Sequence, residues 1–318
     1  MRATRCLITA GAGAMALALA TAAAPAQTYG YATLPPGTLN HTTASAIAKV
    51  LKERAGLNVL VQPMAGGTAI VPLVARGEAE IGATNIMEPQ EYYEDRGFKN
   101  LRIITAINAL RTPFFVRKDS GMRTIADLKG KRVSMGYSAM RSLDIVARAM
   151  LATAGLTEAD IRPVLVPNVV RSADDFVAGA SDMFFFAFGA AKVREVDVTV
   201  GGIRVLEIDE KGMPAARKIM PWGYLTDAAP GPIFTGVEKP MKIYSFDNIL
   251  ITHAEVPDEF IYKMLATMNQ HKDDLIAVQP VLREFSGPFA YKQYGGVPYH
   301  SGAVKYFTDQ GLRPTPIN

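Results

Sequence analysis

Short apolar segments alternate with helix-like segments along the chain, and this alternation constrains the fold more than any other feature of the sequence. The first part of the chain predicts strands over residues 28–34, 57–63, 80–85 and 101–107, because each is a short apolar run bounded by turn residues. Residues 41–56 predict a helix, since their apolar side chains recur at helical spacing. A strand–helix–strand order of this kind predicts a parallel sheet with helices packed on its faces.

The same rhythm begins again near Thr112 and indicates a second α/β unit. Residues 142–156 predict a strongly amphipathic helix, and the segment DMFFFAF (182–188) predicts a buried strand. Residues 242–253 are long and apolar, and we expect them to carry the chain back to the first unit.

The second unit therefore interrupts the first. We predict one lobe made of residues 27–111 plus 245–318 and a second lobe made of residues 112–244. Each lobe contains a strand, a loop rich in Gly, Ser or Thr, and a helix, as at Gly67 and Thr68. A helix start offers free backbone N–H groups, and glycine lets a ligand approach them closely. Two such loops on facing lobes would form a cleft for a small molecule.

Arginines near the predicted loops are candidates for binding an anion. Arg141 precedes a helix, where its guanidinium could hold a carboxylate with two parallel hydrogen bonds; a surface charge is the alternative. Arg111 ends the loop after the fourth strand, beside the expected crossover, and is a second candidate, for which an ion pair at the hinge is the alternative. Phe188 is either a core side chain or a wall of the cleft against an apolar ligand body.

The sequence lacks the motifs of the common catalytic and metal centres. No GxxxxGK[ST], HExxH or GxSxG motif occurs, and the four histidines are scattered. Cys6 is the only cysteine, and it lies near the N-terminus. The net charge of +4 is small for 318 residues and gives no support for nucleic-acid binding. We therefore predict a protein that is not an enzyme and that uses no cofactor and no metal.

The N-terminus has the pattern of an export signal. Arg2 and Arg5 precede the apolar run LITAGAGAMALALATAAA, and the APA at 24–26 supplies the small residues that signal peptidase reads. We expect residues 1–26 to be a signal peptide cleaved after Ala26, which would lower the net charge from +4 to +2. A transmembrane anchor is the alternative, although the run is rich in Ala and Gly and barely long enough to span a bilayer.

Four segments resemble the TAXI-type solute receptors of tripartite ATP-independent periplasmic (TRAP) transporters, with strand–loop–helix blocks in the family order over nearly the whole mature chain. They are PPGTLNHTTASAIAKVL, AGGTAIVPLVARGEAEIGATN, IADLKGKRVSMGYSAMRSLDIVARAMLATAGL and GGVPYHSGAVKYFTDQGL. The last segment is the most specific to this family. The resemblance implies a periplasmic-binding-protein-like α/β fold, in which two lobes joined by hinge strands close on a ligand in the cleft between them.

The resemblance also implies which residues face the ligand. In one jaw of the cleft, Gly67 admits the ligand to the backbone, Thr68 donates a hydrogen bond, and Asn85 ends the neighbouring strand on the same rim. The remaining residues of the predicted site come from the first loop and from the other lobe: Thr38, Asn40, His41, Tyr137, Ser138, Arg141 and Phe188.

Together these features predict a periplasmic receptor that captures a small organic anion, such as a carboxylate or an amino acid, and delivers it to the permease subunits of a TRAP transporter. A receptor of a tripartite tricarboxylate-type transporter is one alternative, because the first two loops resemble that group as well. A ligand sensor for a membrane kinase and an enzyme of similar architecture are the others. The expected partners are the solute and the permease, not nucleic acid.

Overall fold

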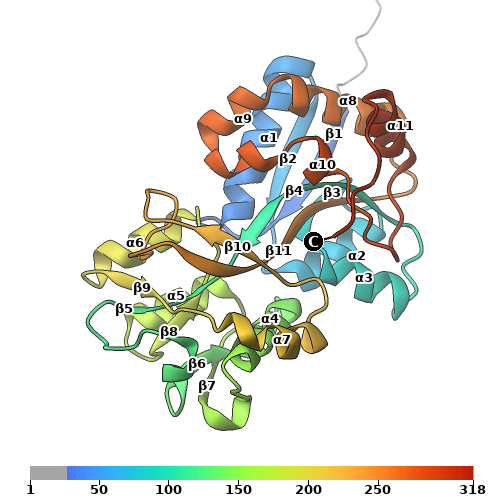
Figure 1. Cartoon of the computed structure of the whole chain (residues 1–318). Coiled ribbons are helices and arrows are strands. Elements are labelled where there is room, and N and C mark those ends of the chain that lie inside the picture. Colours follow the sequence, from blue (N-terminus) through green and yellow to red (C-terminus); the bar gives the residue numbers. More distant parts are fainter. Residues whose placement is uncertain (1–26, 318) are drawn as a thin grey trace, which may run out of the picture.

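The computed structural model describes residues 27–317 and contains two regions joined by long strands (Figure 1). The N-terminal and C-terminal segments both belong to the region drawn at the top, and the middle of the chain forms the region below it. The predicted signal peptide, residues 1–26, lies outside the described residues. Within residues 27–317 no helix combines the length and the apolar composition needed to cross a membrane.

A six-stranded sheet forms the centre of the upper region. Strands β1 (Thr28–Thr33), β2 (Asn58–Pro63) and β3 (Ile81–Asn85) run parallel, as the sequence predicted, and lie in the order β2-β1-β3. The long strand β11 (Met241–His253) pairs antiparallel with β3 along one edge and with β4 (Leu101–Arg111) along the other. Strand β4 therefore runs in the same direction as β3 but is not hydrogen-bonded to it, because β11 is inserted between them and makes the sheet mixed rather than parallel throughout.

Helices cover both faces of this sheet. Helices α1 (Leu39–Ala55), α8 (Asp258–Gln270) and α11 (Ser301–Asp309) share one buried apolar cluster with one face of the sheet. Helix α2 (Gly67–Ala75) packs on the other face against β3 and β11, with α3 (Met87–Glu94) beside it. We call the six-stranded sheet with these helices the large-sheet region.

The second region is built on two small sheets. Strand β5 (Phe114–Arg117) lies between β8 (Met183–Phe185) and β9 (Ile203–Val205), antiparallel to both. Strands β6 (Arg132–Met135) and β7 (Arg162–Leu165) form a parallel pair. The rings of Phe115 and Phe184 stack at a centroid distance of 4.8 Å, so the aromatic run after residue 182 belongs largely to the core.

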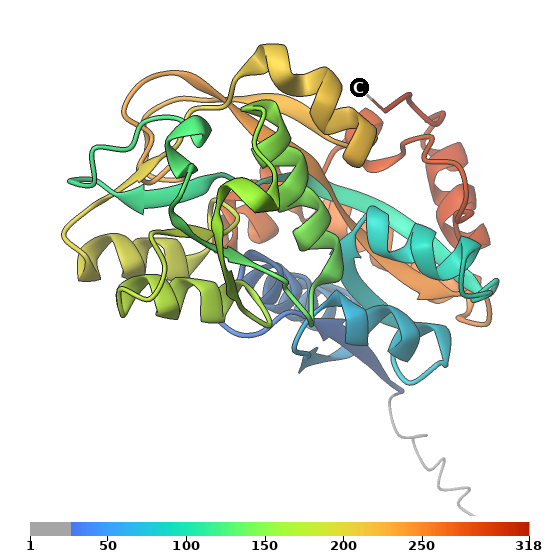
Figure 2. The same ribbon diagram turned by 90° about the horizontal axis from the view of Figure 1, so that it is seen from below.

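The helices of this second, small-sheet region are α4 (Arg141–Thr153), α5 (Val169–Val177), α6 (Ala191–Thr199) and α7 (Met213–Ile219). Figure 2 shows α4 (green) lying beside α7 (amber), in agreement with their contacts. The chain enters the small-sheet region from β4 and leaves it toward β10 (Tyr224–Ala228), which pairs with β11. The lobe boundaries at residues 111/112 and 244/245 stay predictions.

Two local expectations from the sequence differ from the structure. The segment DEFIYKMLATMNQHKDDL (258–275), whose apolar pattern predicts one helix, forms two, because α8 ends before His271 and α9 (Lys272–Val278) begins after it. Helix α3 was not predicted, because the segment MEPQEYYE contains Pro89 and has no clear apolar stripe. The remaining short helices are α10 (Gly287–Ala290), η1 (Ile125–Leu128), η2 (Glu158–Asp160), η3 (Glu210–Gly212) and η4 (Pro280–Glu284).

Candidate functional site

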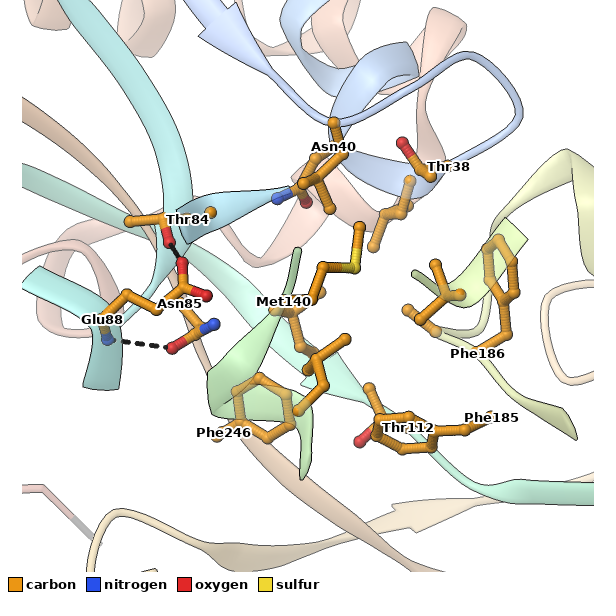
Figure 3. A pocket seen from close by; sticks show the side chains of 17 residues that line it. Thr38, Asn40, Thr84, Asn85, Glu88, Thr112, Met140, Phe185, Phe186 and Phe246 are labelled. Atoms are coloured by element: carbon orange, nitrogen blue, oxygen red, sulfur yellow. Dashed lines mark hydrogen bonds between the residues drawn. The ribbon is translucent and has the colours of Figure 1, made fainter. Parts of the chain in front are cut away.

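A cavity lies where the large-sheet region meets the small-sheet region (Figure 3). On one side it is bounded by the starts of α1 and α2 and by the end of β3, and on the other by the start of α4 and the end of β8. This is the edge at which open α/β sheets bind small molecules. The lining residues are Leu34, Thr38, Leu39, Asn40, Gly67, Thr84, Asn85, Glu88, Leu110, Thr112, Met140, Leu143, Val169, Phe185, Phe186, Ala187 and Phe246.

Thr38 fixes the start of α1 beside the cavity. Its hydroxyl accepts a hydrogen bond from the backbone N–H of His41 at 3.2 Å and donates one to the carbonyl of Pro35 at 2.7 Å. These bonds make Thr38 the N-cap of the helix, which begins at Leu39, two residues before the predicted start at His41. The cap holds the first turn of α1 against the cavity.

Asn40, in that first turn, belongs to a buried chain of amides. The side-chain nitrogen of Asn248 donates to the Oδ1 of Asn40 at 3.0 Å and to the Oδ1 of Asn108 at 3.1 Å. Asn40 lies on α1, Asn108 on β4 and Asn248 on β11, so the chain ties the helix start to the two long strands. The carbonyl oxygen of the Asn248 side chain is buried and has no partner among the described residues.

Glu88 is the only ionisable residue in the lining of the cavity. It is 4% exposed, and its two carboxyl oxygens accept hydrogen bonds from the hydroxyls of Thr84 and Ser142, the latter at 2.7 Å. Both donors are uncharged, and no salt bridge to Glu88 occurs among residues 27–317. Burial of the carboxyl group therefore raises the pKa of Glu88.

Asn85 links Glu88 to the opposite side of the cavity. Its side-chain oxygen accepts from the backbone N–H groups of Met87 and Glu88, which fixes the start of α3. Its side-chain nitrogen donates to the hydroxyl oxygen of Ser142 on α4 at 2.8 Å. Figure 3 shows Asn85 and Thr84 on either side of the Glu88 carboxyl group. Asn85, Ser142 and Glu88 thus form one hydrogen-bonded chain between the two regions.

The glycine pair at the start of α2 is required by close contacts within the protein. A Cβ atom on Gly67 would overlap the carboxyl group of Glu88, and one on Gly66 would overlap the carbonyl oxygen of Ala139. The backbone N–H of Thr68 donates to that same carbonyl at 3.3 Å. The space beside Gly67, which the sequence assigned to a ligand, is occupied by the side chain of Glu88.

The rest of the cavity is apolar apart from a few hydroxyl and amide groups. Leu39, Leu110, Met140, Phe186 and other carbon-rich side chains form most of its surface. Thr112, at the crossover from β4 to β5, is 4% exposed, and its hydroxyl has no hydrogen-bond partner among the described residues. A buried polar group without a partner is costly, so this hydroxyl is a candidate to bind a guest in the cavity.

The structure brings together four of the residues predicted for the site: Thr38, Asn40, Gly67 and Asn85 line the cavity. Thr68 and His41 are half-buried in the first turns of their helices and do not line it. The backbone of Thr68 forms two hydrogen bonds: its N–H donates to the carbonyl of Ala139, and its carbonyl accepts from the hydroxyl of Tyr92.

The residues predicted from the second lobe lie outside the lining. Tyr137 is fully buried, with a positive φ of 28°, and its hydroxyl donates to Ser172 at 3.5 Å. Burial raises the pKa of Tyr137, so it remains neutral. Ser138 and Arg141 are exposed. Arg141 begins α4 and is not among the residues that line the cavity, so the cavity surface lacks the guanidinium that was one of the grounds for expecting an anion.

Phe188 and Arg111 lie at a separate cavity, together with Phe234 and Glu284. The ring of Phe188 packs edge-on against Phe234 at a centroid distance of 5.2 Å. Arg111 forms a salt bridge with Glu284, which is the hinge ion pair considered as the alternative to an anion site. Sequence reasoning missed Glu88, Thr84 and Thr112; the only available signal was the position of Thr84 and Glu88 on either side of Asn85, at the end of a predicted strand.

Metal binding finds no support in this part of the chain. Among residues 27–317, no group of three or more His, Cys, Asp or Glu side chains is arranged to hold a metal ion. The chemistry available in the cavity is therefore hydrogen bonding, one carboxyl group and apolar contact.

Comparison with known proteins identifies a family and a fold. Residues 32–311 match the model of the NMT1-like family. The alkanesulfonate-binding protein SsuA from Xanthomonas axonopodis pv. citri, solved with bound MOPS, is 18% identical over 92% of this chain and 86% of its own, with a TM-score of 0.52. A structure described as a periplasmic transporter is 13% identical over 90% of this chain and 93% of its own, with a TM-score of 0.58. These structures show that the chain has the mixed α/β fold of periplasmic solute-binding proteins.

Proposed function

The chain belongs to the NMT1-like family, and from this premise we propose that it is a solute receptor, which holds a small molecule in the cavity between its two regions and passes it on unchanged to a membrane transporter. The observation that carries the proposal is the composition of that cavity. It is mostly apolar, it is formed by loops from both regions, and it contains buried polar groups such as Thr112 that lack a protein partner.

Hydrogen bonds that cross between the regions support a mechanism of closure. The N–H of Thr68 bonds to Ala139, and Asn85 bonds to Ser142. A solute that touches both regions adds contacts that exist only when these bonds are formed. It therefore shifts the population toward the closed arrangement, and a membrane partner that binds this arrangement better receives the loaded receptor.

The proposed membrane partner is a TRAP-type permease, on the strength of the C-terminal segment that resembles TAXI receptors. A receptor for another class of transporter is the alternative, and the fold shared with an alkanesulfonate-binding protein is compatible with it. Chemical cross-linking in intact cells, followed by mass spectrometry, would separate the two. Recovery of TRAP membrane subunits supports the first, whereas recovery of a transport ATPase contradicts it.

A periplasmic location is part of the proposal, because the N-terminus reads as an export signal and the fold is that of periplasmic receptors. Cell fractionation and N-terminal sequencing test it. We expect the periplasmic fraction to contain a chain that begins at Gln27. A chain that retains residues 1–26 and sediments with the membrane would contradict the signal-peptide prediction.

Thermal denaturation with a library of small metabolites tests the receptor function. A solute present at about 100 times its dissociation constant should stabilise the folded protein by about 2.7 kcal/mol. The variant Ala187→Trp, which fills the cavity, should lose this response, and Ala229→Trp, at an exposed position outside it, should keep it. Failure of every solute to raise the melting temperature, or an equal response in the Ala187→Trp variant, would overturn the proposal.

A further inference from the structure

We propose that the solute carries a protonated nitrogen, and that the carboxylate of Glu88 recognises it inside the cavity. This inference rests on the proposed function and specifies the class of solute that the same site takes. It replaces the expectation of an organic anion, which depended on a guanidinium at the cavity surface.

The first observation is that the carboxyl group of Glu88 is buried without a charged partner. Its oxygens accept one bond each, from Thr84 and Ser142, although a carboxylate can accept about four. Glu88 nevertheless lines the cavity, so it has capacity left for a donor in the cavity. A charge that is nine-tenths or more buried is stable only when it is paired, and a cationic guest supplies the missing charge.

The second observation is the absence of positive charge around the cavity. None of its lining residues is Lys, Arg or His. The charged side chain that acts on the Glu88 carboxyl group is Glu91, one turn further along α3, and Glu91 is itself paired with Arg96 at the surface. A carboxylate in this cavity would therefore meet the acidic Glu88 and no cation of the lining, whereas an ammonium group would be attracted to Glu88.

The third observation is the shape of the remaining lining. Leu110, Met140, Phe185, Phe186 and Phe246 offer apolar surface for a hydrocarbon or aromatic body. The free hydroxyl of Thr112 offers one further hydrogen bond. The cavity thus fits a small amine with an apolar body, whose nitrogen points to Glu88.

A purely structural role for Glu88 is the competing explanation, since its bond to Ser142 also holds α4 against the large-sheet region. The two roles predict different results. A structural link affects all solutes alike, because it changes only how easily the regions close. A recognition group affects solutes according to the charge of their head group.

Calorimetric titration of the wild-type protein with solutes that differ only in their head group tests the inference without any variant. Two series are suitable: benzylamine, benzyl alcohol and benzoate, and butylamine, butanol and butyrate. At neutral pH we expect the amine of at least one series to bind at least tenfold more tightly than its carboxylate. Equal or tighter binding of the carboxylates, or a library hit that is an anion with no detectable amine binding, would overturn the inference and leave the receptor function standing.

The variant Glu88→Gln then separates recognition from structure. We expect it to weaken amine binding at least tenfold and to change alcohol binding by no more than twofold. Glu91→Gln is the matched control, because it removes one negative charge from the same helix at a surface pair with Arg96, and it should change amine binding by no more than about twofold. Equal losses for amine and alcohol in Glu88→Gln would reduce Glu88 to a structural link. A protein that binds no solute of any class would contradict the proposed function itself.

Discussion

Glu88 shows how a single buried carboxyl group sets the chemistry of the cavity. Burial raises its pKa, so the folded protein holds this proton more tightly than the unfolded chain, in which a glutamate has a pKa of about 4.3. The contribution of Glu88 to stability is therefore most favourable below the unfolded pKa. It is lost as the pH rises through the interval between the unfolded and folded values.

The variant Glu88→Gln should remove this pH dependence. We expect its melting temperature to exceed that of the wild type at neutral pH in the absence of solute, and the difference to shrink as the pH falls toward about 4.3. Two other charged side chains act near this position: the charge of Glu91 acts on Glu88, and the charge of Arg141 acts on Tyr92. Melting curves from pH 4 to 8 measure the effect. A difference that grows toward acid pH would contradict the assignment of Glu88 as a buried, uncompensated acid.

Gly67→Ala tests the close approach of the α2 helix start and Glu88. The added methyl group would overlap the Glu88 carboxyl, so we expect a destabilisation of about 1–3 kcal/mol in urea denaturation. Gly231→Ala, where the methyl group meets only an ordinary contact, is the control. Adding Glu88→Ala to the Gly67→Ala chain should recover part of the loss. Additive losses would show that the two positions do not interact.

At the scale of elements, a buried ion pair ties the C-terminal segment to strand β11. Asp247 is 1% exposed and accepts hydrogen bonds from the ammonium group of Lys292, at 2.8 Å to each oxygen, and from the hydroxyls of Tyr224 and Tyr294. Lys292 is 5% exposed. These contacts connect β10, β11 and the segment before α11 at one point.

Lys292→Met should therefore cost about 3–5 kcal/mol, because it leaves the Asp247 carboxylate buried without its charge partner. The control is Lys242→Met, on the same strand as Asp247. It removes a surface ion pair with Asp227 and should cost no more than about 1 kcal/mol. Urea denaturation of both variants measures the difference. Similar small losses in the two would mean that the buried pair adds no more than an exposed one.

Thr38→Ala tests the helix cap that positions Asn40. Loss of the hydroxyl leaves the N–H of His41 without its acceptor, and we expect a destabilisation of about 1 kcal/mol. Thr38→Ser, which keeps the hydroxyl, should retain most of the stability. If alanine and serine behave alike in urea denaturation, the cap does not contribute.

The strands and helices that could be predicted are those with a local signal. The apolar runs of β1, β2 and β3 and the amphipathic α4 stand out in the sequence because their own residues carry the periodicity. The position of β11 between β3 and β4 could not be predicted, because it depends on pairing between segments about 150 residues apart. Helix α3 depends on Asn85, which caps it from the preceding strand, and its own sequence gives little indication of a helix.

The same distinction applies to the site. Gly67 and Asn85 could be placed at the cavity because both follow or end predicted parallel strands, whose carboxyl ends meet at one edge. Glu88 and Ser142 could not, because their proximity results from the packing of α4 against the end of β3. Arg141 is the first residue of its helix rather than the residue before it, and the direction of its side chain has no signature in the sequence.

At the scale of the whole molecule, the chain crosses between its two regions through β4 and β10–β11, and a polar network joins the regions beside the cavity (Figure 1). This arrangement accounts for a receptor whose binding groups come from both regions. A solute in the cavity would contact the large-sheet region through Glu88 and the small-sheet region through Met140 and Phe186, which line it from the two sides.

The crystal structure of the protein with the solute that raises its melting temperature most is the most direct test of this arrangement. We expect the solute in the cavity between the end of β3 and the start of α4, with its polar head within hydrogen-bond distance of Glu88 and its body against Phe186. A solute bound on the outer face of either region, or in a cavity that draws residues from one region alone, would contradict it.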